Sequence, residues 1–517
     1  MTATLLAQSQ AIPQGADYIR ILPELVLSAF GILIMLLDPL VDEEKSQRTL
    51  GLIGFAGTLA ALVSTWYMAK PEHYGLAFSH MVRVDGFSVF FHVLVIAIAA
   101  VVILTSFEYM AVQKIRAGEY YALILFGVVG MALMSSAVEL VLIFIALEIS
   151  SISTYILAGF RRQEAASSES SLKYFLLGSF ATAFFLYGVA MMFGATGSTN
   201  IDVISQALQA SPAGVLVYVA TALMFVGLGF KVAAAPFHIW TPDVYEGAPA
   251  PVVGFMSTAP KAAAFAVLLR VVFTINAPGR FWLVWVAAAL SMTLGNVSAL
   301  VQTNVKRLLA YSSIAHAGYL LVAFAMTTPE DSAMGISAAM FYTAAYAAMN
   351  VGAFAVVSHF ASAGERYVTL EDYEGLGRTS PLLAATLSIF LLSLIGIPIT
   401  GGFFAKFYVF SAALKANLIW LTLIGLVNSA IGAYYYLRII VVMYMREARK
   451  QVPVAPVPFG LGLALALSIV ATLYLGILPN GVLRYAQHAA QGLLPQQAAS
   501  APASAAQIQP PANIPRH

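Results

Sequence analysis

LMFVGLGFKVAAAPFHIWTPDVYEGAPAPVVGFMSTAPKAAAFAVL, residues Leu223–Leu268, is the stretch that decides the fold. Two apolar runs each contain a lysine, Lys231 in the first and Lys261 in the second. A proline lies close to each of them, at Pro236 and Pro260. A charge at the centre of a bilayer costs at least ~2.5–3.5 kcal/mol, so such residues face a bundle interior or a water-filled cavity. Proline removes a backbone donor, and irregular backbone at membrane depth must be packed in protein or line a cavity. The stretch therefore predicts a hydrated polar path through a helical membrane protein.

The composition of the chain supports a membrane protein and excludes several kinds of redox site. Of 517 residues, 60% are hydrophobic and only 10% are charged, whereas about a quarter are charged in soluble domains. There is no cysteine, which excludes thiolate-bound iron–sulfur clusters, c-type haem and disulfides. The eight histidines show no spacing typical of a metal or haem site within an apolar run, and no strand pattern precedes a glycine-rich fingerprint. The sequence predicts no cofactor, no metal and no nucleic-acid site.

Apolar runs of about 20 residues predict an all-α polytopic protein with about fourteen transmembrane helices. Breaks are predicted inside the seventh and twelfth, where proline and glycine interrupt the run. The tail from about Gln487 is rich in Ala, Gln, Pro and Ser and is predicted to be disordered. The predicted segments are 21–40, 49–69, 86–107, 120–137, 140–159, 174–195, 214–239, 250–274, 281–302, 307–327, 333–359, 382–414, 417–444 and 458–478.

A weak internal repeat divides these segments. EISSISTYIL (Glu148–Leu157) lies in the fifth segment and AYSSIAHAGY (Ala310–Tyr319) in the tenth, and the SSI triplets are 162 residues apart. The same offset brings the broken seventh segment close to the broken twelfth. Paired broken helices in two halves are the best pointer from sequence to a transport site, and five segments per copy would make the copies inverted. The predicted parts are an N-terminal three-helix segment (1–118), two five-helix repeats (119–275 and 280–446), a C-terminal helix (447–486) and the tail (487–517).

The distribution of basic residues predicts the orientation. Lys and Arg are about twice as frequent in loops after odd-numbered segments as in the other loops. By the positive-inside rule, the odd-numbered loops are cytoplasmic and both termini lie outside. The first twenty residues show no signal-peptide pattern.

Four residues within the segments are the main candidates for moving charge: Glu148, Lys231, Lys261 and Lys406. Intramembrane acids and amines mark ion paths by default. A lysine that alternates between an acidic partner and a dry site would gain and lose a proton, and Glu148 is the natural partner of Lys231. The alternatives are a Glu148 carboxyl satisfied by nearby serines and lysines whose long stems reach an interface.

His238 and His316 are tentative relay residues. His238 lies close to the break after Lys231, and an interfacial position is as good an interpretation. His316 follows small residues on the tenth segment and can approach a neighbouring helix, where a simple interhelical hydrogen bond would also explain it. Glu24 is a weaker candidate. Arg270 and Arg438 lie nearer segment ends and are expected to extend to the membrane surface.

Three runs resemble a known family: FKVAAAPFHIWTPDVYEGAPAPV with Lys261 downstream, KRLLAYSSIAHAGY, and GIPITGGFFAKF. They resemble the antiporter-like membrane subunits of respiratory complex I, over roughly residues 20–480. Within that family the chain is most similar to the N-type branch, because a lysine stands at position 406 and the chain has no lateral helix after the fourteenth segment.

The resemblance implies two inverted five-helix repeats, segments 4–8 and 9–13, around a central polar axis. It implies an interacting pair at Glu148 and Lys231, a central relay at Lys261 and a terminal proton site at Lys406, with His316 as a further axis residue. It also implies M-type and K-type neighbours in a bacterial inner membrane. NADH, FMN, iron–sulfur clusters and quinone are expected in partner subunits.

The sequence thus predicts a non-redox, proton-translocating subunit of an NADH–quinone oxidoreductase. Two alternatives stay open: a subunit of a multisubunit cation/proton antiporter, and a structural membrane subunit whose polar residues only hold helices together.

Overall fold

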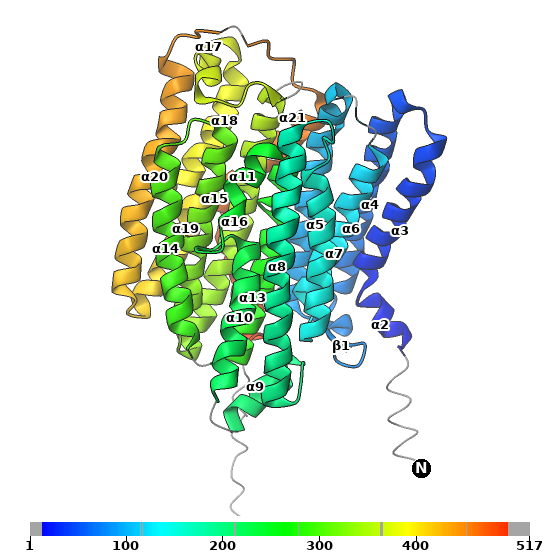
Figure 1. Ribbon diagram of the computed structural model, residues 1–517, viewed down its shortest axis with the longest axis vertical. Coiled ribbons are helices and arrows are strands. Elements are labelled where there is room, and N and C mark those ends of the chain that lie inside the picture. Colours follow the sequence, from blue (N-terminus) through cyan, green and yellow to red (C-terminus); the bar gives the residue numbers. More distant parts are fainter. Residues whose placement is uncertain are drawn as a thin grey trace, which may run out of the picture.

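The computed structural model describes residues 13–113, 115, 117–210, 214–277, 279–361, 365–450 and 452–494. Nearly all of the described chain is helical, and the long helices run side by side (Figure 1). The first spans are α3 (Leu22–Leu37), α4 (Glu43–Met68), α5 (Gly86–Gln113), α6 (Gly118–Ser136), α7 (Leu140–Ala158), α8 (Ala165–Thr196) and α10 (Val215–Val232). They are followed by α11 (Trp240–Gly247), α12 (Ala250–Met256), α13 (Ala259–Arg270), α14 (Arg280–Leu300), α15 (Val305–Val322), α16 (Pro329–Ala361), α18 (Pro381–Ile395), α19 (Gly401–Lys415), α20 (Ile419–Met445) and α21 (Phe459–Ile477).

Short elements connect the spans. The small helices are α2 (Gly15–Ile19), α9 (Ile201–Ala210), α17 (Leu376–Thr379) and α22 (Asn480–Gln491), and a π-helical turn, η3, covers Val271–Ile275. The 3₁₀ turns are η1 (Asp38–Leu40), η2 (Pro71–His73), η4 (Ala323–Ala325) and η6 (Leu370–Tyr373). The strands β1 (Gly75–Ala77) and β2 (Val82–Val84) form an antiparallel hairpin between α4 and α5.

The prediction of about fourteen spans is confirmed. Thirteen helices of the described chain are long and apolar enough to cross a membrane. The remaining span, predicted at 382–414, is divided into α18 and α19, because Gly396 takes a φ of +95° and ends α18. The predicted seventh span is likewise divided into α10 and α11, and Ala233, at a φ of 60°, ends α10.

Three expectations were wrong. The eighth segment was expected to be continuous, but it turns at Ser257–Thr258, between α12 and α13. No strand was expected, and the β1–β2 hairpin is too short for its pattern to be recognised. The tail was placed from about Gln487, whereas α22 extends to Gln491 and packs against α5 and α16. Residues 495–517 of the predicted tail lie outside the described residues.

The two repeats are visible in the order of the helices. Each copy contains two spans, a very long helix, a broken span and a final span. The long helices are α8, with 32 residues, and α16, with 33 residues. The broken spans are α10–α11 and α18–α19. Because each copy crosses the membrane an odd number of times, the copies have opposite orientations, as predicted.

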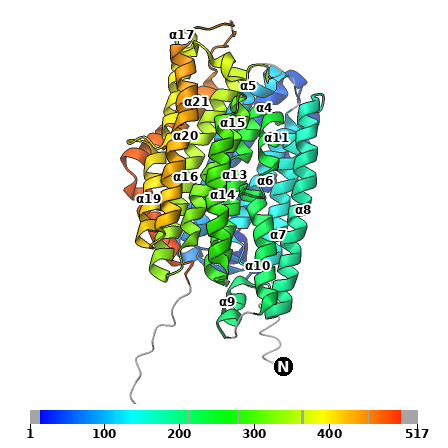
Figure 2. The ribbon, with the colours of Figure 1, turned by 60° about the vertical axis from the view of Figure 1, so that its left-hand side comes forward.

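The centre of the bundle is formed by α12–α13, α15 and α16. Every residue of Ala250–Ile275 is buried, whereas α3, α4 and α20 are largely exposed along their outer sides. Alanines at 259, 262, 263, 264 and 266 allow neighbouring helices to approach α13 closely. The chain crosses the bundle from α3 and α4 at one edge to α20 at the other (Figure 1). After a turn of 60°, α8 lies at one edge and α19 near the other (Figure 2).

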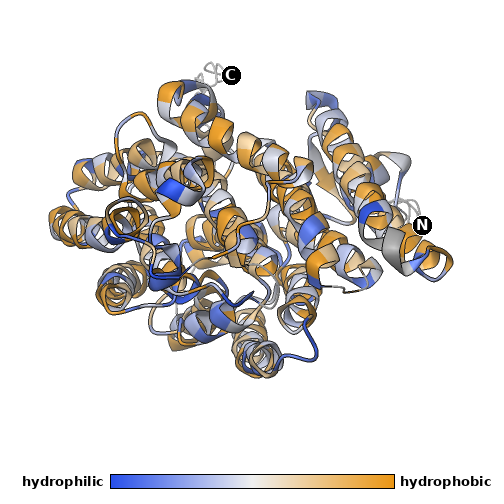
Figure 3. Cartoon of the chain, turned by 90° about the horizontal axis from the view of Figure 1, so that it is seen from above, coloured by the Kyte–Doolittle hydropathy of each residue, from blue (hydrophilic) through white to orange (hydrophobic). Residues whose placement is uncertain are grey.

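The outer surface is suited to lipid. Large apolar side chains are exposed on several outer helices, among them Trp66, Phe180 and Trp420. Seen from above, apolar colour dominates the helices around the perimeter (Figure 3). The buried lysines described next therefore lie inside an otherwise apolar bundle.

Candidate functional site

Lys231 is buried at the last turn of α10, where the broken span ends. Its Nζ donates a hydrogen bond to Ser151 Oγ on α7 at 2.8 Å. The rings of Tyr155 and Tyr174 lie 5.9 and 5.8 Å from this nitrogen, close enough to attract a cation. The C-terminal end of a helix carries partial negative charge, so the break itself favours the protonated amine.

The sequence suggested that Glu148 pairs with Lys231. The structure shows no direct ion pair between them. Both residues are described, and Lys231 Nζ donates its hydrogen bond to Ser151 and not to Glu148. The two still interact electrostatically at longer range. One carboxylate oxygen of Glu148, Oε1, is buried without a hydrogen-bond partner. Ser151 takes the position next to the amine that had been expected for the carboxylate.

Lys261 lies directly after the turn between α12 and α13, with 2% of its surface exposed. Its Nζ donates to Ser313 Oγ on α15 at 2.5 Å, and Tyr346 on α16 donates to the same oxygen at 2.8 Å. The Tyr245 ring of α11 lies 5.8 Å from the amine. Lys261 belongs to the first repeat and Ser313 to the second, so this hydrogen bond joins the two repeats.

His316 lies one turn further along α15 and is buried. Its Nδ1 is 2.8 Å from the Tyr342 hydroxyl and its Nε2 is 3.2 Å from the Tyr436 hydroxyl. Tyr436 is also hydrogen-bonded to Ser312. Both Lys261 and Lys406 act electrostatically on the imidazole. His316 is therefore close enough to both lysines to be affected by their charges, and it lies within a group of hydroxyls.

Lys406 connects the two half-helices of the broken span in the second repeat, α18 and α19. From α19 its Nζ donates to the carbonyl oxygens of Leu394 (3.1 Å) and Ile395 (2.8 Å), the last residues of α18. It also donates to Ser429 Oγ on α20 at 2.9 Å. Carbonyl groups at a helix end lack intrahelical partners, which makes them suitable acceptors for an amine. Gly402 is required here, because a Cβ would overlap the Ser393 carbonyl oxygen.

Together these side chains form an axis from α7 through α10, α13 and α15 to α19. Each lysine lies beside a helix break and donates to a serine: Ser151, Ser313 or Ser429. These serines were not among the predicted site residues. A signal for two of them was present, since Ser151 and Ser313 occupy the same place in the repeated SSI triplets.

His238 is not part of this axis. It lies in the turn between α10 and α11, partly exposed, and its Nδ1 has no hydrogen-bond partner among the described residues. Trp240 joins the two half-helices instead, since its Nε1 donates to the Phe230 carbonyl at 3.0 Å and its ring stacks on Tyr174 at 4.4 Å. The relay role of His238 stays a prediction without a contact to support it.

The expectation that Arg270 extends to the membrane surface was wrong, whereas the same expectation for Arg438 stays a prediction. Arg270 is 1% exposed and binds both carboxylate oxygens of Asp85, at 3.0 and 3.1 Å. Arg438 donates to the Leu300 and Gln302 carbonyls at the end of α14. A partner far away in the sequence made the burial of Arg270 possible, and this partner cannot be inferred from the local sequence.

A cluster at the α17 end of the bundle holds the connection between α11 and α12. The Glu365 carboxylate accepts from the backbone N–H of Ala250 at 2.6 Å and from the Tyr109 hydroxyl at 2.8 Å. Lys306 donates to Glu365 and to the Ala248 carbonyl. Burial alone would raise the pKa of Glu365, but the charges of Lys306 and Arg161 lower it below its usual value. The cluster holds the loop that leads to Lys261, and it could not be predicted because its members lie far apart in the sequence.

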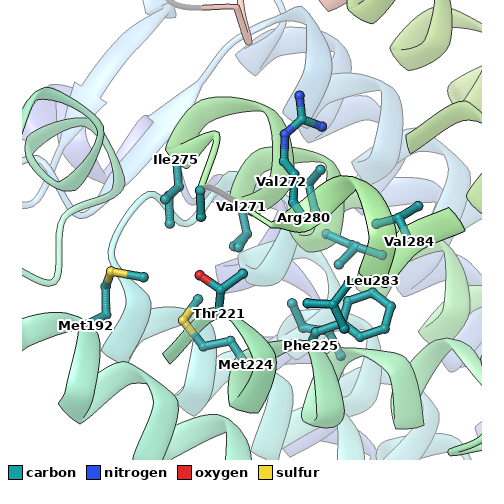
Figure 4. A pocket seen from close by; sticks show the side chains of 13 residues that line it. Met192, Thr221, Met224, Phe225, Val271, Val272, Ile275, Arg280, Leu283 and Val284 are labelled. Atoms are coloured by element: carbon teal, nitrogen blue, oxygen red, sulfur yellow. The ribbon is translucent and has the colours of Figure 1, made fainter. Parts of the chain in front are cut away.

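A small apolar pocket lies away from the axis, between α10, η3 and α14. It has a volume of about 30 Å³ and is lined mainly by apolar side chains such as Met224, Phe225 and Val271 (Figure 4). The Arg280 guanidinium points away from the other labelled side chains. No axis residue lines this pocket. Within the described ranges there is also no group of His, Asp or Glu that could hold a metal ion.

The comparisons with known proteins identify the family of the chain. The family "NADH:quinone oxidoreductase/Mrp antiporter, TM" matches residues 137–432, which is more than half of the chain. NADH-quinone oxidoreductase subunit N 2 of Koribacter versatilis is 66% identical over 94% of this chain and 99% of its own length. Subunit N 1 of Solibacter usitatus is 51% identical over 92% of this chain and 98% of its own length.

Two solved structures have the same fold. A chain of respiratory complex I from Thermus thermophilus with bound aureothin is 37% identical, with a TM-score of 0.76 over 89% of this chain and 98% of its own. A chain of the Mrp complex from Dietzia sp. has a TM-score of 0.80 over 92% of this chain and 97% of its own, at 21% identity, and shows the fold alone. The family match and the full-length relatives together show that this chain belongs to the NADH:quinone oxidoreductase/Mrp antiporter family, among its NADH-quinone oxidoreductase N subunits.

Proposed function

We propose that this chain translocates protons across a bacterial inner membrane, as a subunit of an NADH–quinone oxidoreductase. The observation that carries the proposal is the axis itself. Three buried lysines at three helix breaks each donate to a serine hydroxyl, and the charges of two of them act on His316. Family membership supports the same function.

Serine partners make the lysines suitable for changing charge. A carboxylate in direct contact would hold a buried amine protonated, whereas a neutral hydroxyl accepts a hydrogen bond from either the charged or the neutral amine. Glu148 acts on Lys231 from a longer distance. A small movement of Glu148 would therefore change the proton affinity of Lys231, and the change would pass to Lys261 and Lys406.

The energy required is modest. Moving one charge against 100 mV costs about 2.3 kcal/mol. A tenfold change in proton affinity corresponds to about 1.4 kcal/mol. Changes of about a hundredfold along the axis would therefore drive a proton against a membrane voltage of this size.

The redox reaction is assigned to other subunits of the complex. The chain has no cysteine, which excludes thiolate-bound iron–sulfur clusters in it. NADH, FMN, iron–sulfur clusters and quinone would bind elsewhere, and quinone reduction would act on this chain through neighbouring M-type and K-type subunits. The α17 end, with its basic loops, would face the cytoplasm, and both termini would lie outside.

Lys406→Ala tests the proposal. We expect the complex to assemble and oxidise NADH while moving fewer protons per NADH, because the amine at the end of the axis is lost. The measurement is proton uptake into inverted vesicles at matched NADH oxidation rates. Lys415→Ala is the matched control, since Lys415 lies on the same helix α19 but is exposed.

Two results would contradict the proposal. Full proton uptake per NADH in Lys406→Ala would favour a structural role for the buried amines. Uptake of sodium in place of protons, in a chain isolated without NADH-oxidising subunits, would favour a cation/proton antiporter.

A further inference from the structure

A second cluster of buried ionisable side chains lies apart from the lysine axis. It contains Glu24 on α3, His92 on α5 and Arg270 at the end of α13, with exposed fractions of 3%, 0% and 1%. Asp85, between β2 and α5, completes it and is partly exposed. The β1 and α2 labels show that this is the end of the bundle opposite α17 (Figure 1).

Glu24 and His92 are in direct contact, with Oε1 and Nε2 2.9 Å apart. His92 Nδ1 lies 2.7 Å from the Ser88 carbonyl oxygen, which only accepts, so this nitrogen carries a proton. A carboxylate facing an imidazole nitrogen at 2.9 Å requires one further proton between them. The pair is therefore either a carboxylic acid with a neutral imidazole or a carboxylate with an imidazolium, and both forms have no net charge.

The pair is built to accept a second proton. Glu24 Oε2 is buried and has no hydrogen-bond partner in the described chain. Leaving a buried polar atom unpaired is costly, so a vacant acceptor at this depth needs an explanation. Protonation of Oε2, with the imidazolium kept beside it, would give the pair a net positive charge.

The surroundings of the pair connect it to the partly exposed Asp85. Ser135 Oγ lies 3.0 Å from His92 Nδ1, and the Ser135 carbonyl accepts from Arg270 Nε at 2.9 Å. The guanidinium is thus two hydrogen bonds from the imidazole, and its own charge is balanced by Asp85. Asp85 is paired with Arg270 and also accepts from the Ser88 N–H at 2.7 Å, which connects the cluster to the partly exposed surface.

We propose that Glu24 and His92 form a second protonation site, which takes up one proton from water during turnover and releases it at the β1 end of the bundle. This inference rests on the proposed function. In the uptake step the proton adds to Glu24 Oε2, and in the release step the pair returns to its neutral form. No other reactant is needed.

Glu24→Gln is the first test. A glutamine amide can still donate to His92 Nε2, so a purely structural contact would be kept while the acid is lost. We expect proton transfer at this site to slow about 10²-fold, the lower end of the effect of losing an acid–base group. The readout is protons moved per NADH in inverted vesicles, together with the infrared difference spectrum on NADH addition. A protonated-carboxyl band that shifts in D₂O should be present in the unmodified complex and absent in Glu24→Gln.

Glu72→Gln is the matched control, since Glu72 is exposed on the nearby turn before β1. An unchanged proton ratio together with an unchanged carboxyl band in Glu24→Gln would overturn the proposal. If Glu24→Gln does not assemble, His92→Gln tests the pair from the other side, and loss of assembly in both variants would show that the pair serves only the fold. Running Lys406→Ala in parallel separates the two ideas. If Lys406→Ala loses pumping and Glu24→Gln does not, only the inference about Glu24 and His92 is contradicted. If Glu24→Gln loses pumping and Lys406→Ala does not, the role of the lysine axis is contradicted and the role of Glu24 and His92 is supported.

Discussion

Lys261→Ala should cause the largest loss of proton translocation of any single change on the axis. Lys261 joins the two repeats through Ser313, and its charge acts on His316. Proton transfer requires partners within hydrogen-bond reach or separated by one water, and no other amine reaches Ser313 in the described structure. We expect the proton flux through this chain to fall about 10²-fold or more, as for the loss of an essential acid–base group.

The measurement is proton uptake into vesicles over a range of NADH oxidation rates. Ser313→Ala should reduce the same flux less severely, because it removes the acceptor but keeps the amine. Lys70→Ala is the control, since Lys70 is exposed in the loop after α4. Undiminished proton uptake per NADH in Lys261→Ala would show that the axis does not pass through this residue.

Glu365→Ala should produce the largest loss of stability. The change leaves Lys306 and Arg161 buried without their shared carboxylate and removes the acceptor for the Ala250 N–H. Removing one partner of a buried ion pair typically costs ~3–5 kcal/mol. We expect the assembled complex to unfold at a lower temperature in detergent and to accumulate to a lower level in the membrane.

The pH dependence of this effect follows from the sign of the shift. The pKa of Glu365 is lowered in the folded chain, despite burial that would raise it, because Lys306 and Arg161 stabilise the carboxylate. Its contribution to stability is therefore complete above the pKa of an unfolded glutamate and is lost as the pH falls through the lowered value. Unmodified protein and Glu365→Ala should become more alike in melting temperature under acid conditions. A constant difference between them would contradict the assignment. Glu447→Ala, at an exposed position near α17, is the control.

The sequence was sufficient for the spans because their signal is local. Long apolar runs predict fourteen crossings, and the glycines and proline around Gly401 predict the break between α18 and α19. The turn at Ser257–Thr258 was missed, because neither residue is a strong helix breaker and the apolar run continues through them. The β1–β2 hairpin has only three residues per strand, too few for an alternating pattern.

The lysines were predictable from their cost in a membrane, but their partners were not. Lys231 lies 80 residues from Ser151, and Lys261 lies 52 residues from Ser313. Which side chain meets an amine depends on how the helices pack, and Glu148 was favoured only because opposite charges attract. The same reasoning explains Arg270, whose partner Asp85 is 185 residues away. Only the repeated SSI triplets carried information on such contacts.

The hydrogen bond between Lys261 and Ser313 makes the centre of the molecule sensitive to mechanical displacement. At 2.5 Å it spans the boundary between two bodies of opposite orientation. A slide of about 1 Å between them would carry the two atoms past the normal hydrogen-bond limit of about 3.2 Å. The amine would then face water or His316 in place of its serine. A displacement of one repeat by a neighbouring subunit could in this way change the proton affinity of Lys261. No side chain of the axis would need to move far.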